Sequence, residues 1–216
     1  MKIKNFIYKI YYLYLSRFID GKLKLFNRHN NYKAYIDKQL EKTLDPKRIN
    51  KLKNEEWNIK VDGFRHLFKR NQEFLENKRN SICLGSRTGH EVFVLRELGI
   101  KSIGVDLAEF PPYTIKGDVH NLKFKSEQFD LIFTNILDHS LYLDKFISEM
   151  ERICIKNGNI IINIQKNIRG DIYSENIIND TAPIVEMFKN SVLVKNRKIK
   201  NTFDAMNTEM IFKKIN

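Results

Sequence analysis

A turn that contains two glycines, and an acid further along the chain, have residue types and a spacing that suit ligand binding. The segment Gly85-Ser86-Arg87-Thr88-Gly89 comes directly after the apolar run 82–84. Glycine allows a tight turn and a close approach of helix, strand and ligand at such a position. Asp106 ends a second apolar run, 21 positions after Gly85. An acid at this distance is placed to accept hydrogen bonds from two ribose hydroxyls. A packed turn without a ligand is the alternative interpretation.

Alternating strands and helices are needed to bring these residues together. Short apolar runs predict strands over 81–84, 102–106, 113–116, 129–135 and 160–164. Apolar residues at helical spacing predict helices over 61–75, 92–98, 143–153 and 183–189. Two further strand-like runs, 192–199 and 210–215, predict an antiparallel hairpin at the sheet edge. The fold class is therefore α/β, a doubly wound and mostly parallel sheet.

The first 60 residues differ from the rest and are expected to form a basic, aromatic-rich helical extension of a domain over 61–216. Residues 2–19 approximate one apolar helical face, too interrupted for a membrane span or a signal peptide. Two interpretations stay open for this segment, a helix on an anionic membrane surface and a lid packed on the domain. Residues 31–44 form a second amphipathic segment, with Tyr32, Tyr35, Ile36, Leu40 and Leu44 on its apolar face. Pro46 then suits the first turn of a helix that runs toward Trp57.

The positive charge is concentrated outside the centre of the chain. The formal net charge is +12, and residues 1–30 carry seven Lys or Arg and one Asp. Residues 81–165 instead carry nine basic and eleven acidic residues. This distribution favours a basic outer surface facing an anionic partner, unless it reflects compositional bias of the source. Cys83 and Cys154 lie in apolar runs and are expected to be buried thiols, and no zinc spacing is present.

Five short motifs, in this order, resemble a class I S-adenosylmethionine-dependent methyltransferase of the type 11 branch. They are Ile82 to Gly89, Val105-Asp106, Gly117-Asp118, Phe129-Asp130 and Lys156-Asn157-Gly158. The resemblance covers about residues 61–165 and extends more loosely to 216. It implies a Rossmann-like fold and S-adenosylmethionine as cofactor.

The resemblance also implies roles for individual residues. Asp106 would bind the ribose, and Asp118 would face the adenine amino group beside Val119. Thr134 and Asn135 would line the transfer site, and Asp138 and His139 would begin a segment that faces the substrate. The cofactor contacts implied in this way are Gly85, Ser86, Arg87, Thr88, Gly89, Glu91, Asp106, Leu107, Asp118, Val119 and Asn135.

The chain departs from the family pattern at three places. Cys83 stands where an acid is usual, two residues before the first glycine, and Glu91 is a candidate replacement for holding the cofactor ammonium. Arg87 stands at the usual middle glycine, so its side chain must point away or toward the methionine carboxylate. Eleven residues separate Asp106 from Asp118, and the helix usual there is reduced to the Pro111-Pro112 loop.

Methyl transfer needs a nucleophile held in line with the methyl group, and a base only if the acceptor must lose a proton. His139 is the best candidate base by residue type, with Asp138 to orient it or act itself. His120 and His90 are second and third candidates. A histidine at a helix start without a catalytic role is the alternative for His139. No metal site is expected.

The chemical class of the methyl acceptor is less directly indicated by the sequence. We expect a small-molecule, lipid or glycan acceptor and a cytoplasmic protein, with peripheral contact to the inner face of an anionic membrane through residues 1–30 as an option. An RNA methyltransferase that uses the basic flanks is an alternative, although no RNA-binding motif is present. A nicotinamide-dependent oxidoreductase lacks the full Gly-x-Gly-x-x-Gly spacing, and a non-catalytic cofactor-binding protein is a further alternative.

Overall fold

The structure is a computed structural model that describes residues 22–25, 29, 31–200 and 205–216. The helix predicted over residues 2–19, with its two interpretations, lies outside the described residues. Among the residues that are described, no helix has both the length and the apolar character needed to cross a membrane.

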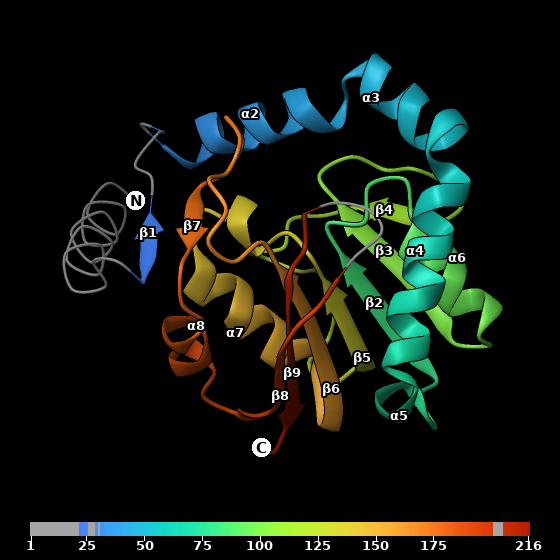
Figure 1. Cartoon of the computed structure of the whole chain (residues 1–216), viewed down its shortest axis with the longest axis vertical. Helices are drawn as coiled ribbons and strands as arrows, with labels where there is room; N and C mark the ends of the chain where they lie inside the picture. The colour runs from blue at the N-terminus through green and yellow to red at the C-terminus, as the bar shows by residue number, and fades with distance from the viewer. Residues whose placement is uncertain (1–21, 26–28, 30, 201–204) are drawn as a thin grey trace.

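One seven-stranded sheet forms the centre of the molecule, as the alternating pattern predicts (Figure 1). The strand order is β4-β3-β2-β5-β6-β9-β8. The first five strands in this order are mutually parallel, whereas β9 runs antiparallel to both β6 and β8. This is the expected doubly wound sheet with an antiparallel edge hairpin. The strands are β2 (Asn80–Leu84), β3 (Lys101–Asp106), β4 (Thr114–Lys116), β5 (Phe129–Thr134), β6 (Cys154–Ile164), β8 (Ser191–Lys198) and β9 (Thr208–Lys214).

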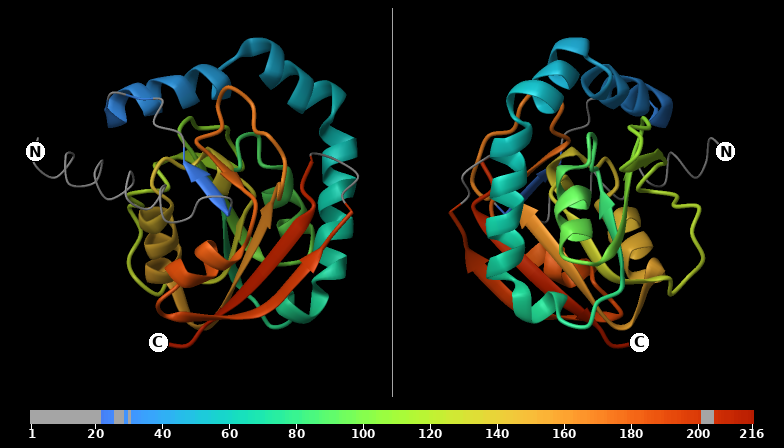
Figure 2. Two further views of the ribbon diagram at one scale, coloured as in Figure 1. Left: turned by 60° about the vertical axis from the view of Figure 1, so that its left-hand side comes forward. Right: turned by 90° about the vertical axis from the view of Figure 1, so that its right-hand side faces the viewer.

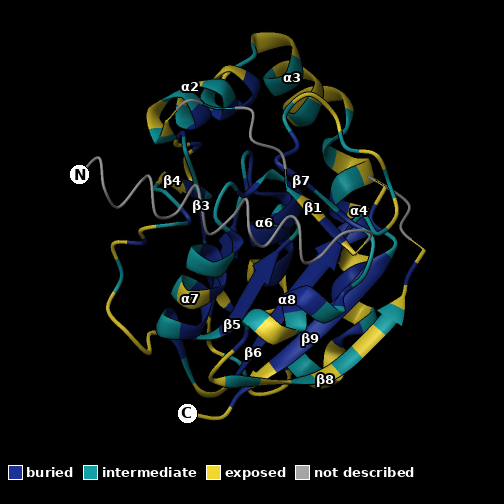
Figure 3. Ribbon diagram, turned by 90° about the vertical axis from the view of Figure 1, so that its left-hand side faces the viewer, coloured by how far each residue is buried: buried dark blue, intermediate teal, exposed yellow. Residues whose placement is uncertain are grey.

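Helices cover both faces of the sheet and divide the core in two. On one face lie α4 (Trp57–Arg70) and α6 (His90–Glu97), and on the other α7 (Leu143–Ile153) and α8 (Ala182–Met187). Strand β2 serves both layers, because Cys83 packs with α4 and α6 while Ile82 and Leu84 pack with α7. The central strands are accordingly buried along their length, as Figure 3 shows. The apolar core thus fixes the ends of the parallel strands at one edge.

Several element boundaries differ from the predicted ones. The helix predicted over 61–75 begins at Trp57 and breaks at Asn71, before the short α5 (Gln72–Leu75). Asn71 is fully buried and its amide donates to the carbonyl of Leu67 and to Glu209, which ends the helix there. Strand β6 begins at Cys154 rather than at 160, because the 156–159 turn is a bulge against β5, with Asn157 at a φ of 63°.

A second, two-stranded sheet was not predicted. It pairs β1 (Leu23–Leu25) with β7 (Asn176–Ile178) in antiparallel register. The extension over 1–60 is therefore not entirely helical, and the segment 167–180 is not entirely loop. Strand β1 brings the chain to the beginning of α2 (Tyr32–Thr43).

Helices α2 and α3 (Pro46–Asn50) arch over the carboxyl ends of the parallel strands (Figures 1 and 2). A π-helical turn, η1 (Lys51–Glu55), connects α3 to α4. The buried face of α2 agrees with the predicted apolar one only at Tyr35: Gln39, Lys42 and Thr43 are also buried, whereas Leu44, just after the helix, is 51% exposed. A largely polar face is buried because α2 covers the polar strand ends and not the apolar core.

Candidate active site

The turn after β2 has a backbone shape that requires glycine at both ends. Gly85 and Gly89 have φ values of 82° and 84°. A Cβ on Gly85 would lie 2.5 Å from Ile136, and a Cβ on Gly89 would collide with Tyr113. Between them, Arg87 also has a left-handed φ of 42°. This shape turns the backbone amides toward the end of the neighbouring strand β3.

Asp106, the last residue of β3, is bonded to this turn. One carboxylate oxygen accepts from the Arg87 amide at 2.9 Å, and the other from the Leu107 amide at 2.8 Å. Burial raises the pKa of the Asp106 carboxyl above its ordinary value, against the opposing effects of Arg87, the two amides and a hydrogen bond from Thr43. The acid therefore has its two oxygens held in a defined orientation at the carboxyl edge of the sheet.

Two adjoining cavities open from this edge. The first, which we call the inner cavity, has a volume of about 60 Å³ and is lined by Thr43, Arg87, Asp106, Leu107, Asp118 and Val119, among others. The second, the outer cavity, has a volume of about 250 Å³ and is lined by Arg48, Lys60, Ser86, Thr88, Glu91 and Asn135, among others. Both cavities are also bounded by Lys42, Gly85, Arg87, Ile136 and His139.

Asp118, at the far end of the inner cavity, is held by the arch helix α2. Its carboxylate accepts from the Tyr32 hydroxyl at 2.6 Å and from the His120 amide at 2.9 Å. Burial would raise the pKa of Asp118, but hydrogen bonds from His120 and Tyr32 outweigh it and lower the pKa. In turn, burial and the Asp118 carboxylate raise the pKa of the Tyr32 hydroxyl. Tyr32 therefore donates to a carboxylate that remains ionised.

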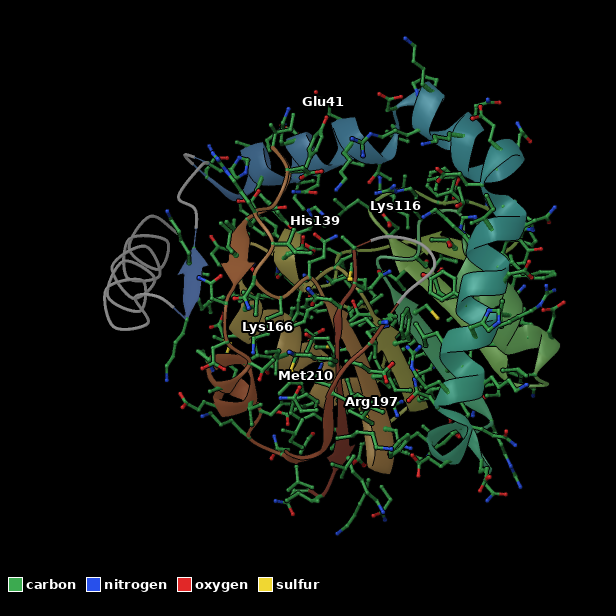
Figure 4. The ribbon with its side chains drawn as sticks, in the orientation of Figure 1. Glu41, Lys116, His139, Lys166, Arg197 and Met210 are labelled. Atoms are coloured by element: carbon green, nitrogen blue, oxygen red, sulfur yellow. The ribbon has the colours of Figure 1, made fainter. Side chains whose placement is uncertain are left out.

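His139 ends the short 3-10 helix η2 (Leu137–His139), which follows β5 and lies beneath α2 (Figure 4). Its Nδ1 lies 3.0 Å from the carbonyl oxygen of Tyr173, so this nitrogen is assigned as the protonated one. Its Nε2 then accepts from the Lys42 ammonium at 3.0 Å and lies 3.6 Å from the Asp138 carboxylate. The imidazole is thus oriented with its basic nitrogen next to a cation and an acid.

Lys42 is a buried cation, 6% exposed, between the two cavities. Burial lowers the pKa of its ammonium to about 8, and Arg87 and Arg48 act in the same direction, against Asp171 and Asp138. The Asp171 carboxylate lies 3.7 Å away.

This pKa predicts a pH dependence of stability. Because the unfolded chain holds the Lys42 proton up to about pH 10.5 and the folded chain loses it near pH 8, the unfolded state binds more protons in this window. The free energy of unfolding should therefore rise by about 1–2 kcal/mol from pH 8 to 10, relative to Lys42→Met. Urea unfolding at both pH values measures it, and parallel curves for both proteins would contradict it.

Glu91 lies on the first turn of α6, buried beside the position where the family acid is missing. Burial and the Glu91 carboxylate both raise the pKa of the Cys83 thiol well above its ordinary value. Glu91 also lines the outer cavity. A carboxylate therefore lies next to Cys83, although it comes from α6 and not from β2.

The comparisons with known proteins agree with this geometry. Residues 82–162 match the methyltransferase domain family. This segment is therefore similar to the domain of S-adenosylmethionine-dependent methyltransferases, and the chain has their Rossmann-like fold. No curated protein matches the sequence.

Solved structures with the same fold are distant in sequence from this chain. One is the 1,6-didemethyltoxoflavin-N1-methyltransferase of Burkholderia thailandensis with S-adenosylhomocysteine bound, 13% identical, with a TM-score of 0.65 over 90% of this chain and 95% of that one. A SAM-dependent methyltransferase from Archaeoglobus fulgidus is 16% identical, with a TM-score of 0.59 over 79% and 100% of the two chains. The PH0226 protein of Pyrococcus horikoshii is 14% identical, with a TM-score of 0.59 over 76% and 93%.

The other histidines predicted as candidates lie away from the outer cavity or are held in place. His120 has a buried side chain, and its Nε2 lies 2.8 Å from the Ser140 hydroxyl while its Nδ1 faces Asp118. The His90 ring lines the outer cavity, but its Nε2 lies 3.1 Å from the Leu52 carbonyl and the ring packs on Trp57. Of the three histidines, His139 alone borders both cavities.

The two residues at the carboxyl end of β5, Thr134 and Asn135, have different surroundings. Thr134 is fully buried and its hydroxyl donates to the carbonyl of Leu84 at 3.0 Å, which links β5 to β2. Asn135 lines the outer cavity. Within the described parts of the chain, no group of three or more His, Cys, Asp or Glu residues could hold a metal ion.

Sequence reasoning missed the polar residues of the arch. Lys42 and Thr43 of α2 and Arg48 of α3 border the cavities, and Tyr32 holds Asp118. The available signal was the spacing of Tyr32, Tyr35, Gln39 and Lys42, which share one helical face. Because Gln39 and Lys42 are polar, the search for apolar periodicity grouped Tyr32 and Tyr35 with other apolar residues and not with these two.

Proposed function

We propose that this chain binds S-adenosylmethionine in the inner cavity and at the Gly85–Gly89 turn, and transfers its methyl group to a small molecule in the outer cavity. The observation that carries the proposal is the hydrogen bond from the Arg87 backbone amide to the Asp106 carboxylate, which joins the glycine turn to the end of β3. Asp106 lines the inner cavity, and Arg87 lines both cavities. We further propose that residues 31–60, which include the arch, act as a lid on the domain over 61–216.

The residues around the turn fit the functional groups of this cofactor. The Nε atom of Arg87 is buried and has no hydrogen-bond partner among the described residues, and a cofactor carboxylate would provide one. Glu91 would accept from the cofactor ammonium, in place of the missing acid at Cys83. Asp106 would accept from the ribose hydroxyls, and Asp118 and Leu107 with Val119 would border the adenine.

When bound, S-adenosylmethionine supplies an electrophilic methyl group on a sulfonium centre. His139 would accept the proton that an acceptor hydroxyl or amine loses. The Tyr173 carbonyl holds the proton on Nδ1 and leaves Nε2 as the basic atom, and the nearby Asp138 carboxylate would stabilise the positive charge. Lys42 donates to that Nε2, so the acceptor would have to displace it.

The size of the outer cavity supports a small acceptor. An engineered cavity of about 150 Å³ holds benzene, so the 250 Å³ of the outer cavity suits a compact molecule or the reacting part of a lipid or glycan. An RNA substrate would have to pass beneath α2 and α3. Membrane contact through residues 1–30 stays a prediction.

Calorimetric titration with S-adenosylmethionine and S-adenosylhomocysteine tests the proposal, with NADH as the control. We expect micromolar binding of the first pair and none of NADH. Labelled S-adenosylmethionine should then methylate a component of a small-molecule extract and not RNA. Absence of cofactor binding by folded protein would overturn the proposal, and methylated RNA would favour the RNA alternative.

The inner cavity implies that α2 shifts when the cofactor binds. Its 60 Å³ is less than half of the roughly 150 Å³ of the engineered cavity that holds benzene, so a purine does not fit beneath Tyr35. Tyr32 also holds Asp118, which the adenine amino group would need. We therefore propose that the arrangement described is a closed form of the lid.

Removal of the Tyr32 hydroxyl should favour the open form. We expect Tyr32→Phe to bind S-adenosylhomocysteine about three- to ten-fold more tightly, because a hydrogen bond to a charged group no longer holds the lid closed. Lys33→Ala, on the exposed side of the same helix, is the control and should leave the affinity unchanged. Weaker binding by Tyr32→Phe would show that the hydroxyl contacts the cofactor or stabilises the bound form.

A further inference from the structure

Three cationic side chains converge on one wall of the outer cavity from three different elements. Lys42 comes from α2, Arg48 from α3, and Arg87 from the turn after β2. Lys42 and Arg48 both lie over the Tyr173 ring, with their charged groups 5.2 and 5.3 Å from its centre, and Arg87 lines both cavities together with Lys42. Like charges held together at a partly buried site are unfavourable unless anions compensate them.

Carboxylates among the described residues neutralise the positive charge of this cluster only in part. Lys42 has Asp171 at 3.7 Å. Arg48 forms no ion pair in the parts of the chain that the structure describes, and its guanidinium lies 5.3 Å from the centre of the Tyr173 ring. The buried Nε of Arg87 likewise has no hydrogen-bond partner there. Two of the three cations thus line the outer cavity with side-chain donors that have no acceptor among the described residues.

The cofactor cannot by itself balance this excess. Its carboxylate and ammonium cancel, and its sulfonium adds a further positive charge. Arg87 borders both cavities and is placed to take the cofactor carboxylate, whereas Arg48 lines only the outer cavity. The charge that the cofactor leaves uncompensated therefore lies on the acceptor side, at Arg48 and Lys42.

We infer that the acceptor is an anion, and that Arg48 and Lys42 bind its carboxylate or phosphate group. This inference rests on the proposed methyl transfer. The planar guanidinium of Arg48 suits two parallel hydrogen bonds to such a group. The Tyr173 ring would hold the guanidinium in orientation, and the ammonium of Lys42 would leave His139 to meet the anion. The same displacement would free the basic nitrogen of His139 for the acceptor.

Competition and binding experiments on the full chain test the inference. Protein saturated with S-adenosylhomocysteine is titrated by calorimetry with phenyl phosphate, benzoate and the neutral benzyl alcohol. We expect one of the two anions to bind at least about ten-fold more tightly than benzyl alcohol, and which one does so separates phosphate from carboxylate recognition. Arg48→Gln should reduce that affinity about ten-fold or more, and Arg48→Lys by less.

Lys47→Gln is the matched control, since it removes an exposed cation from the same helix. It should leave anion affinity unchanged, and none of these variants should change the affinity for S-adenosylhomocysteine. Equal anion binding in Arg48→Gln and the parent, or displacement of S-adenosylhomocysteine by the anion, would overturn the inference and leave the proposed function intact. Failure of S-adenosylhomocysteine to bind the parent protein would overturn both.

Discussion

Asp106→Ala is expected to weaken binding of S-adenosylhomocysteine by about 100-fold or more, as measured by calorimetry. The proposed contacts are two hydrogen bonds from ribose hydroxyls to a charged acceptor, each worth about 1.5–3 kcal/mol. The substitution also removes the acceptor of the Arg87 amide, so the turn loses its connection to β3. Both effects act on the cofactor side of the site.

Two further variants separate binding from folding. Asp106→Asn keeps the shape of the side chain while it removes the charge, and we expect a loss of affinity close to that of Asp106→Ala. Glu109→Ala removes an exposed acid from the following loop and should bind as the parent does. Thermal unfolding of all three should remain cooperative. Unchanged affinity in Asp106→Asn would contradict the ribose role.

His139→Ala is expected to lower turnover about 100-fold and to leave the affinity for S-adenosylhomocysteine within about two-fold of the parent value. General-base assistance is lost, whereas the turn and Asp106 remain. The measurement is the initial rate of methyl transfer from labelled S-adenosylmethionine, beside calorimetry on the same preparation.

The exposed His66 of α4 supplies the matched control. His66→Ala should change neither rate nor affinity. If His139→Ala lost cofactor affinity to the same extent as Asp106→Ala, the division between a cofactor-binding acid and a base on the acceptor side would be wrong. A normal rate in His139→Ala would mean that the acceptor needs no base or finds one elsewhere.

The sheet was predictable because local signals sufficed for it. The buried runs that became β2, β3 and β5 contain apolar residues bounded by glycine or an acid, and α7 begins and ends at the predicted residues 143 and 153. Glycine at 85 and 89 marks the turn, since both positions have a left-handed φ that glycine adopts without strain. These features depend on backbone conformation and on nearby residues.

The position of α2 and α3 over the strand ends was not predictable, because the contacts of α2 join residues that are distant in sequence. Tyr32 reaches Asp118 across 86 positions, and Lys42 reaches His139 across 97. No local sequence pattern around Tyr32 or Lys42 predicts which residue the side chain contacts. The three-residue strands β1 and β7 are too short for periodicity to identify, and only their pairing defines them. Tertiary structure decides these elements.

The carbonyl of Tyr173 is shared between two donors, the Gln39 amide of α2 at 2.7 Å and the His139 imidazole at 3.0 Å. A shift of α2 that admits the cofactor must therefore also disturb the loop beside the outer cavity. Cofactor and acceptor would then not bind at random: the cofactor enters first, and the methylated product leaves before S-adenosylhomocysteine. Product-inhibition patterns would be those of an ordered mechanism, with lid opening as a candidate for the slow step of each cycle.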